Sequence, residues 1–113
     1  MKYSNKPFNT IDQGNQSSYR EGGVEEITRI ENWRAFWQRH KPSIPVPEVD
    51  FGQYEVVAVF MGEQPSSSYD LEITKVKMNE TGTISISVDY TVKGKTIDSP
   101  TVQQPYQIIQ VPL

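Results

Sequence analysis

Residues 49–71 read VDFGQYEVVAVFMGEQPSSSYDL, and this stretch decides the fold. Residues 55–61 form an apolar run that alternates only weakly, which predicts a strand buried on both of its faces. A polar Gly-Glu-Gln-Pro-Ser-Ser-Ser segment follows, and we expect a second strand to begin at Tyr69. A central strand that leads into a hydroxyl-rich loop is typical of a rigid scaffold presenting that loop to a partner.

Length and composition exclude several classes of protein. A chain of 113 residues predicts one domain with a modest core. The net charge of -3 and the scattered lysines and arginines argue against a nucleic-acid partner and against a polybasic membrane anchor. The sequence contains no cysteine, so thiol nucleophiles, disulfides and thiolate metal sites are excluded. No apolar run approaches the roughly 18 residues of a membrane span.

The aromatic residues of the first half predict a helix. Trp33, Phe36, Trp37 and His40 follow the spacing i, i+3, i+4, i+7, which places them on one face of a helix over residues 31–41 that ends at Pro42. We expect this stripe to be core, with an aromatic platform for a sugar or a peptide as the alternative. His40 is expected to be an ordinary helix-ending cation rather than a general base.

Other segments indicate antiparallel strands. Alternating apolar residues predict strands over residues 25–30, 69–78, 83–92 and 106–111, with a hairpin turn over 79–82. The apolar phase shifts between Ile73 and Val76, which predicts a β-bulge in the second of these strands. We therefore predict an α+β fold of mainly antiparallel sheet, a sandwich or a partly open barrel, with one Trp-rich helix near residues 31–41.

The chain is expected to divide into a polar lead, residues 1–23, and a single domain, residues 24–113. Two alternatives stand for the lead: an edge strand pinned by Phe8 and Ile11, or a flexible tail. A short strand near residues 16–20 is a further expectation. The lead lacks the apolar core of a signal peptide.

The order of these features resembles the C-terminal domain family of the protease complex subunit PrcB. The shared features are a helix with paired tryptophans, a Pro-Val-Asp-Phe-like entry, an apolar strand ending in Gly, a loop ending in Tyr, and a Pro-Tyr approach to the last strand. In this chain they are Trp33 with Trp37, residues 47–51, residues 56–62, residues 65–69 and residues 103–106. The chain departs from the family pattern where Ser66-Ser67-Ser68 replaces Thr-Gly-Gly and where Gln103 replaces Thr.

The resemblance implies a non-catalytic, extracytoplasmic domain associated with a surface or secreted protease. We therefore expect a protein partner, no cofactor, and export to the periplasm or cell surface with the signal removed; a cytoplasmic location stays open. Residues 65–69 and 105–106 are also distantly similar to the loops of chagasin-type inhibitors of cysteine proteases. A protease inhibitor and a ligand- or glycan-binding module are thus the alternative functions.

The two loops are the predicted partner-binding surface. Its residues are Glu63, Gln64, Ser66, Ser67, Ser68, Tyr69, Gln103, Gln104, Pro105 and Tyr106. No catalytic residue is predicted, because the serines lack the Gly-x-Ser-x-Gly context of a nucleophile elbow. No metal site is predicted either, because Glu48, Asp50 and Glu55 lack the ligand spacing of a calcium loop. Asp50 is expected to accept backbone N–H bonds in a turn.

Overall fold

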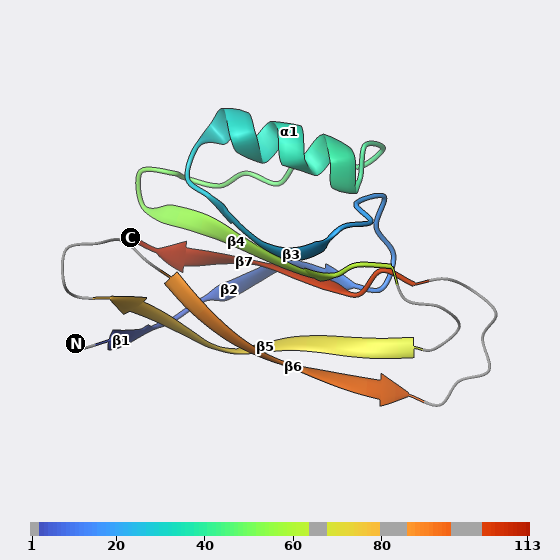
Figure 1. Cartoon of the computed structure of the whole chain (residues 1–113). Coiled ribbons are helices and arrows are strands. Elements are labelled where there is room, and N and C mark those ends of the chain that lie inside the picture. The colour runs from blue at the N-terminus through green and yellow to red at the C-terminus, as the bar shows by residue number, and fades with distance from the viewer. Residues whose placement is uncertain (1–2, 64–67, 80–85, 96–102) are drawn as a thin grey trace.

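The computed structural model describes residues 3–63, 68–79, 86–95 and 103–113 (Figure 1). The elements of these residues are, in chain order, β1 (Tyr3–Lys6), β2 (Asn9–Gly14), β3 (Gly22–Ile27), α1 (Ile30–His40), β4 (Tyr54–Met61), β5 (Ser68–Asn79), β6 (Ile86–Lys95) and β7 (Tyr106–Pro112). Within the described residues, no helix has the length and apolar content that a membrane-spanning helix needs.

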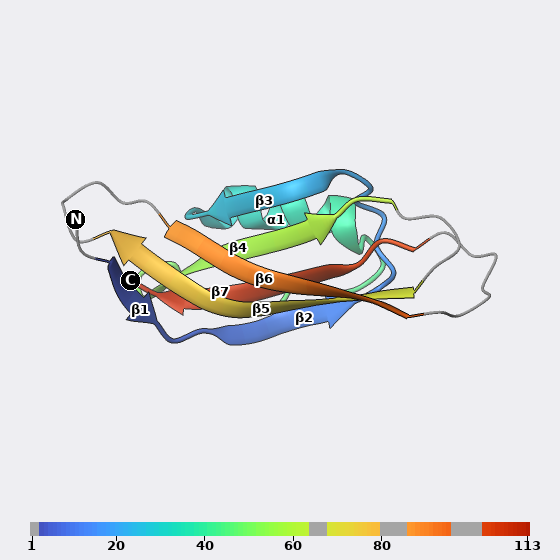
Figure 2. The same cartoon turned by 60° about the horizontal axis from the view of Figure 1, so that its bottom comes forward.

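The strands form two antiparallel sheets, and the helix adds a third layer. One sheet has the order β2-β7-β4-β3 and the other has the order β1-β5-β6. Figure 1 shows α1 on one face of the first sheet and β5 with β6 on the opposite face. Figure 2 shows β5 and β6 crossing over β4 and β7. The predicted α+β fold of mainly antiparallel sheet is confirmed, and the sheet does not close into a barrel.

Strands β4 and β7 form the centre of the molecule because their side chains are buried on both faces. Six consecutive residues of β4 are buried, as are all but two of the seven residues of β7. Val56, Ala58 and Ile108 face the helix. Val57, Val59 and Ile109 face β5. The weak alternation of residues 55–61 therefore predicted its two-sided burial correctly.

Helix α1 covers the first sheet with its aromatic stripe. Trp33 and Trp37 are 0% and 2% exposed, so the prediction of a core stripe is confirmed and the aromatic platform is wrong. Both indole N–H groups donate to the proline-rich connector, Trp33 Nε1 to Pro47 O and Trp37 Nε1 to Ile44 O, each at 2.9 Å. These bonds satisfy the only polar group of each indole and fix the connector along the helix.

A buried glutamine joins the two sheets next to a bulge in β5. The pairing of β5 with β6 shifts register between Ile73 and Lys75, which confirms the predicted bulge. The N–H of Ile73 donates to Gln107 Oε1 of β7 at 2.6 Å, and Gln107 Nε2 donates to the Thr10 hydroxyl of β2 at 3.0 Å. Gln107 is 1% exposed. The buried amide of Gln107 thus links β7 and β2 of the first sheet to β5 of the second sheet.

The N-terminal lead contributes strands to both sheets. β1 pairs with β5, and β2 pairs with β7 as an edge strand. Phe8 and Ile11 pack against opposite faces of the central sheet, as the edge-strand alternative requires. The expected strand near residues 16–20 is wrong: this segment turns from β2 toward β3 without regular structure. The predicted hairpin turn over residues 79–82 falls largely outside the described residues.

Truncation of β7 should show that both faces of the central sheet stabilise the fold. Ile108 and Ile109 are each 0% exposed and lie in different core clusters. We expect Ile108→Ala and Ile109→Ala each to lower the free energy of unfolding by about 2–5 kcal/mol, measured by urea denaturation. Val24→Ala in β3, where Val24 is 54% exposed, should change it by less than about 0.5 kcal/mol. A loss below about 1 kcal/mol for either isoleucine would contradict burial on that face.

Candidate functional site

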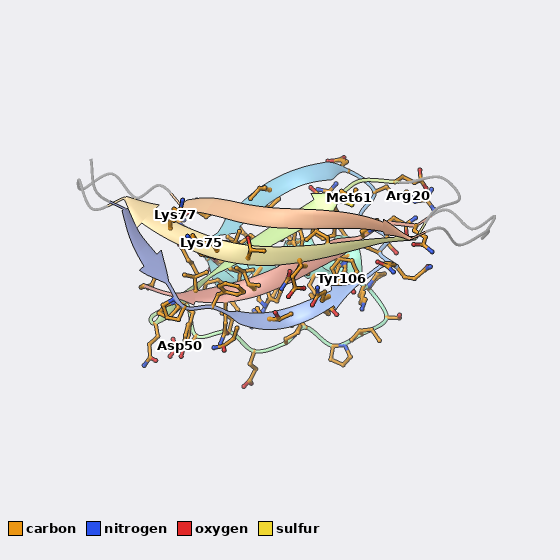
Figure 3. All side chains as sticks on the ribbon, turned by 90° about the horizontal axis from the view of Figure 1, so that it is seen from below. Arg20, Asp50, Met61, Lys75, Lys77 and Tyr106 are labelled. Carbon is orange, nitrogen blue, oxygen red and sulfur yellow. The ribbon has the colours of Figure 1, made fainter. Side chains whose placement is uncertain are left out.

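The described ends of the two predicted segments lie at one end of the molecule. β4 ends where β7 begins, with Phe60 opposite Tyr106, and the N–H of Met61 donates to Pro105 O at 3.0 Å. Gly62 adopts a φ of +76°, which favours glycine, and this turns the chain out of β4. Figure 3 shows Arg20 and Met61 at this end and Asp50 toward the opposite end. We call it the β4–β7 end.

The predicted partner-binding residues are unequally exposed at this end. Glu63 is exposed and forms an ion pair with Arg20 at 3.6 Å. Gln103 is half-buried, whereas Gln104, Pro105 and Tyr106 are buried. Tyr106 is only 2% exposed, so its side chain belongs to the core. The 103–106 segment therefore presents little side-chain surface beyond Gln103.

The remaining predicted residues are less fully placed. Ser68 and Tyr69 begin β5, opposite Lys95 and Gly94 of β6. Gln64, Ser66 and Ser67 lie outside the described residues. The prediction of a partner-binding surface at these positions stays a prediction.

A cavity of about 840 Å³ opens at the β4–β7 end. Polar side chains line most of it, and Glu63 and Gln104 bring the two predicted segments into one concave surface. Its lining residues are Gln16, Ser17, Ser18, Arg20, His40, Lys41, Pro42, Ser43, Ile44, Glu63 and Gln104. Most of these residues come from the turn after β2 and from the C-terminal end of α1, which the sequence did not indicate as a site.

A hydrogen-bonded polar cluster lies beside the cavity, and three of its members, Ser17, His40 and Lys41, line it. His40 Nδ1 lies 2.6 Å from Ser17 Oγ, and His40 Nε2 lies 2.9 Å from Asp12 Oδ2. The same Asp12 oxygen accepts from Tyr106 OH at 3.0 Å and lies 3.0 Å from Lys41 Nζ. We call these five residues the Asp12 cluster. His40 is 1% exposed and burial lowers its pKa, so the expectation of an ordinary helix-ending cation is wrong.

Aromatic rings hold the imidazole in place. The centroid of the His40 ring lies 4.5 Å from that of Tyr106, 5.0 Å from that of Trp37 and 5.7 Å from that of Phe60. The i+7 position of His40 on the aromatic stripe puts it in the core, and this position was the available signal for its burial. Ser17 and Asp12 come from the polar lead, where no pattern marked them.

The surroundings of the cluster lower the pKa values of both His40 and Asp12, but for different reasons. Burial lowers the pKa of His40 below its ordinary 6.5, although Asp12 opposes this. Burial alone would raise the pKa of Asp12, but hydrogen bonds from His40, Lys41 and Tyr106 outweigh burial and hold it below 3.8. Near neutral pH the cluster therefore holds a neutral imidazole beside an ionised carboxylate.

Asp50 Oδ1 accepts the N–H of Gly52 at 2.9 Å, which confirms the expected turn contact. Among the residues the structure describes, no group of three or more histidine, aspartate or glutamate side chains is placed to hold a metal ion.

Comparison with known proteins agrees with this architecture. The fold defines the chain as a small α+β domain whose central strand pair is covered by one helix and a second sheet. The family model of the PrcB C-terminal domain matches residues 56–112, from the third residue of β4 to the end of β7. The chain therefore belongs to the PrcB C-terminal family. No curated protein and no solved structure matches it.

The Asp12 cluster should make stability fall on acidification in two steps. Because the folded pKa of His40 lies below 6.5, the unfolded chain takes up this proton first, so the free energy of unfolding should decrease as pH falls below about 6.5. Because the folded pKa of Asp12 lies below 3.8, its contribution should be lost as pH falls further. Urea denaturation from pH 8 to pH 3 measures both steps.

Two variants assign the steps. His40→Gln should remove the first step, and Asp12→Asn should reduce the second. A wild-type profile whose slope between pH 7 and pH 5 matches that of His40→Gln would contradict the first assignment.

Proposed function

We propose that this chain is a non-catalytic protein-interaction domain that stabilises or modulates an extracytoplasmic protease complex. The observation that carries the proposal is the family match over residues 56–112, which includes both predicted contact segments. The matched residues include most of β4, all of β7 and both predicted contact segments.

The β4–β7 end has the properties of a contact surface on a rigid support. Buried strands β4 and β7 hold the loop ends in place, and rigid scaffolds commonly present binding loops in this way. The ion pair between Arg20 and Glu63 is exposed, with side-chain exposures of 71% and 44%. Exposed pairs of this kind contribute little to stability, so both charges are available to a partner.

The described residues support the alternative functions less well. An inhibitor that wedges two loops into a protease cleft needs protruding side chains, and Gln104, Pro105 and Tyr106 are buried. A glycan-binding module needs an exposed aromatic surface, whereas Trp33 and Trp37 are in the core.

Site-specific crosslinking in the source organism tests the proposal. A photo-crosslinking amino acid at position 63 should capture a protease or a protease-associated subunit, identified by mass spectrometry. The same amino acid at position 48 is the matched control, because Glu48 is also an exposed glutamate and lies two residues before Asp50, toward the opposite end of the molecule (Figure 3). Glu63→Lys should weaken retention of the partner at least about tenfold, and Glu48→Lys should not.

The outcome also separates the alternatives. Equal capture from positions 63 and 48, or capture of no protease component from either, would contradict the proposal. If purified domain lowers the activity of the captured protease, and Ala substitution of residues 66–69 abolishes that effect, the inhibitor alternative replaces it.

A further inference from the structure

We propose that Ser17 is an activated nucleophile, with His40 as its general base and Asp12 as the residue that orients the imidazole. Ser17, His40 and Asp12 form a continuous chain of hydrogen bonds, 2.6 Å from Ser17 Oγ to His40 Nδ1 and 2.9 Å from His40 Nε2 to Asp12 Oδ2. A hydroxyl, an imidazole and a carboxylate in this order are the parts of a serine-nucleophile triad, which is recognised by geometry rather than by sequence position.

The contacts of Asp12 determine which ring nitrogen is the base. An ionised carboxylate only accepts hydrogen bonds, so His40 must donate to it from Nε2–H. The lone pair of the neutral imidazole is then on Nδ1, which faces the Ser17 hydroxyl. Ser17 O–H therefore donates to His40. In the usual triad Nε2 is the base and Nδ1–H donates to the carboxylate. Here Nδ1 is the base and Nε2–H donates to Asp12.

Asp12 is itself held in position. Lys41 Nζ and Tyr106 OH both contact its Oδ2 at 3.0 Å, and these contacts favour the ionised carboxylate. The surrounding aromatic rings leave the imidazole little freedom to turn. The geometry needed for proton transfer is thus formed before any ligand binds.

The Ser17 oxygen can still attack. A serine hydroxyl has one donor and two acceptor positions. Ser17 donates to His40 Nδ1 and accepts the N–H of Tyr19 at 3.0 Å, which leaves one lone pair. Ser17 is half-buried and lines the 840 Å³ cavity, so an electrophile in this cavity can reach the hydroxyl.

The cavity favours a polar acyl ester as the substrate class. Five of its eleven lining residues carry a hydroxyl or an amide, and Arg20 and Lys41 bring positive charge to its wall, which favours a developing oxyanion. Ser17 Oγ would attack the ester carbonyl while His40 Nδ1 takes its proton. The C–O bond to the alcohol then breaks and the alcohol leaves with that proton. Water releases the acid by the same route, with His40 again as base.

Most residues of this site lie outside the matched part of the chain. Asp12, Ser17, His40 and Lys41 precede residue 56, where the match begins, and Tyr106 lies within it. The proposed reaction goes beyond the non-catalytic role proposed above: if it is found, the domain is catalytic as well as protein-binding, and the protein interaction can be present or absent in either case.

A fluorophosphonate probe tests the nucleophile directly on the purified full chain. Attack by Ser17 forms an O–P bond and expels fluoride, and the proton passes to His40. We expect one adduct by intact mass, mapped to Ser17 by peptide mass spectrometry. Ser17→Ala should abolish it. Ser18→Ala should not, because Ser18 lines the same cavity but its hydroxyl is not the one bonded to His40.

Two further readouts distinguish a nucleophile from a structural contact. The labelling rate should fall as pH decreases through the pKa of His40, because only the neutral imidazole accepts the proton. Asp12→Asn, checked for folding by circular dichroism, should slow labelling about a hundredfold or more through loss of the base. Absence of an adduct on folded wild type, or an adduct that survives Ser17→Ala, would overturn the proposal. So would labelling that Asp12→Asn and pH leave unchanged; the contact between Ser17 and His40 would then serve only the fold.

Discussion

The structure depends on one constraint, the burial of β4 and β7 on both faces. A strand pair whose side chains are largely apolar on both faces cannot leave either face in water, so each face needs its own cover. Helix α1 supplies one cover and β5 with β6 supplies the other (Figure 1). The edges of the sheet follow from the same constraint, because β2 and β3 complete the hydrogen bonding of β7 and β4.

Several polar groups buried among the described residues are held by specific partners. Gln107 joins the sheets through Ile73 and Thr10, and the two tryptophans give their N–H groups to the connector. Asp12 balances the charge of Lys41 while His40 stays neutral. A half-satisfied buried cluster costs far more than a satisfied one. The turn after β2 and the end of α1 are therefore fixed to each other by hydrogen bonds as well as by the packing of Tyr19 on Phe36.

Sequence patterns predicted the parts of the fold that rest on periodicity. Three local patterns were sufficient: the weak alternation of residues 55–61, the aromatic stripe of α1 and the phase shift after Ile73. Each pattern follows from which side chains of one element are buried. The burial of Tyr106 was missed because a loop-like Pro-Tyr sequence does not show that His40 and Phe60 pack against the ring. Asp12 and Ser17 could not be found at all. Their role arises from a contact with His40, 28 and 23 residues away, in a segment whose composition suggested only a polar lead.

The two candidate functions use different chemistry at the same end of the molecule. The partner surface rests on exposed groups such as Glu63 and on the loops that β4 and β7 support, and it needs no proton transfer. The Ser17 site rests on a buried base and on a hydroxyl at the cavity wall. Gln104 connects them: its Oε1 accepts the N–H of Ser17 at 3.2 Å, and its backbone N–H donates to Asn15 O at 2.8 Å. A partner that displaced the 103–106 segment would therefore remove two of the bonds that position the Ser17 turn. Contact at the loops and reactivity at Ser17 are thus joined by a short path of named hydrogen bonds.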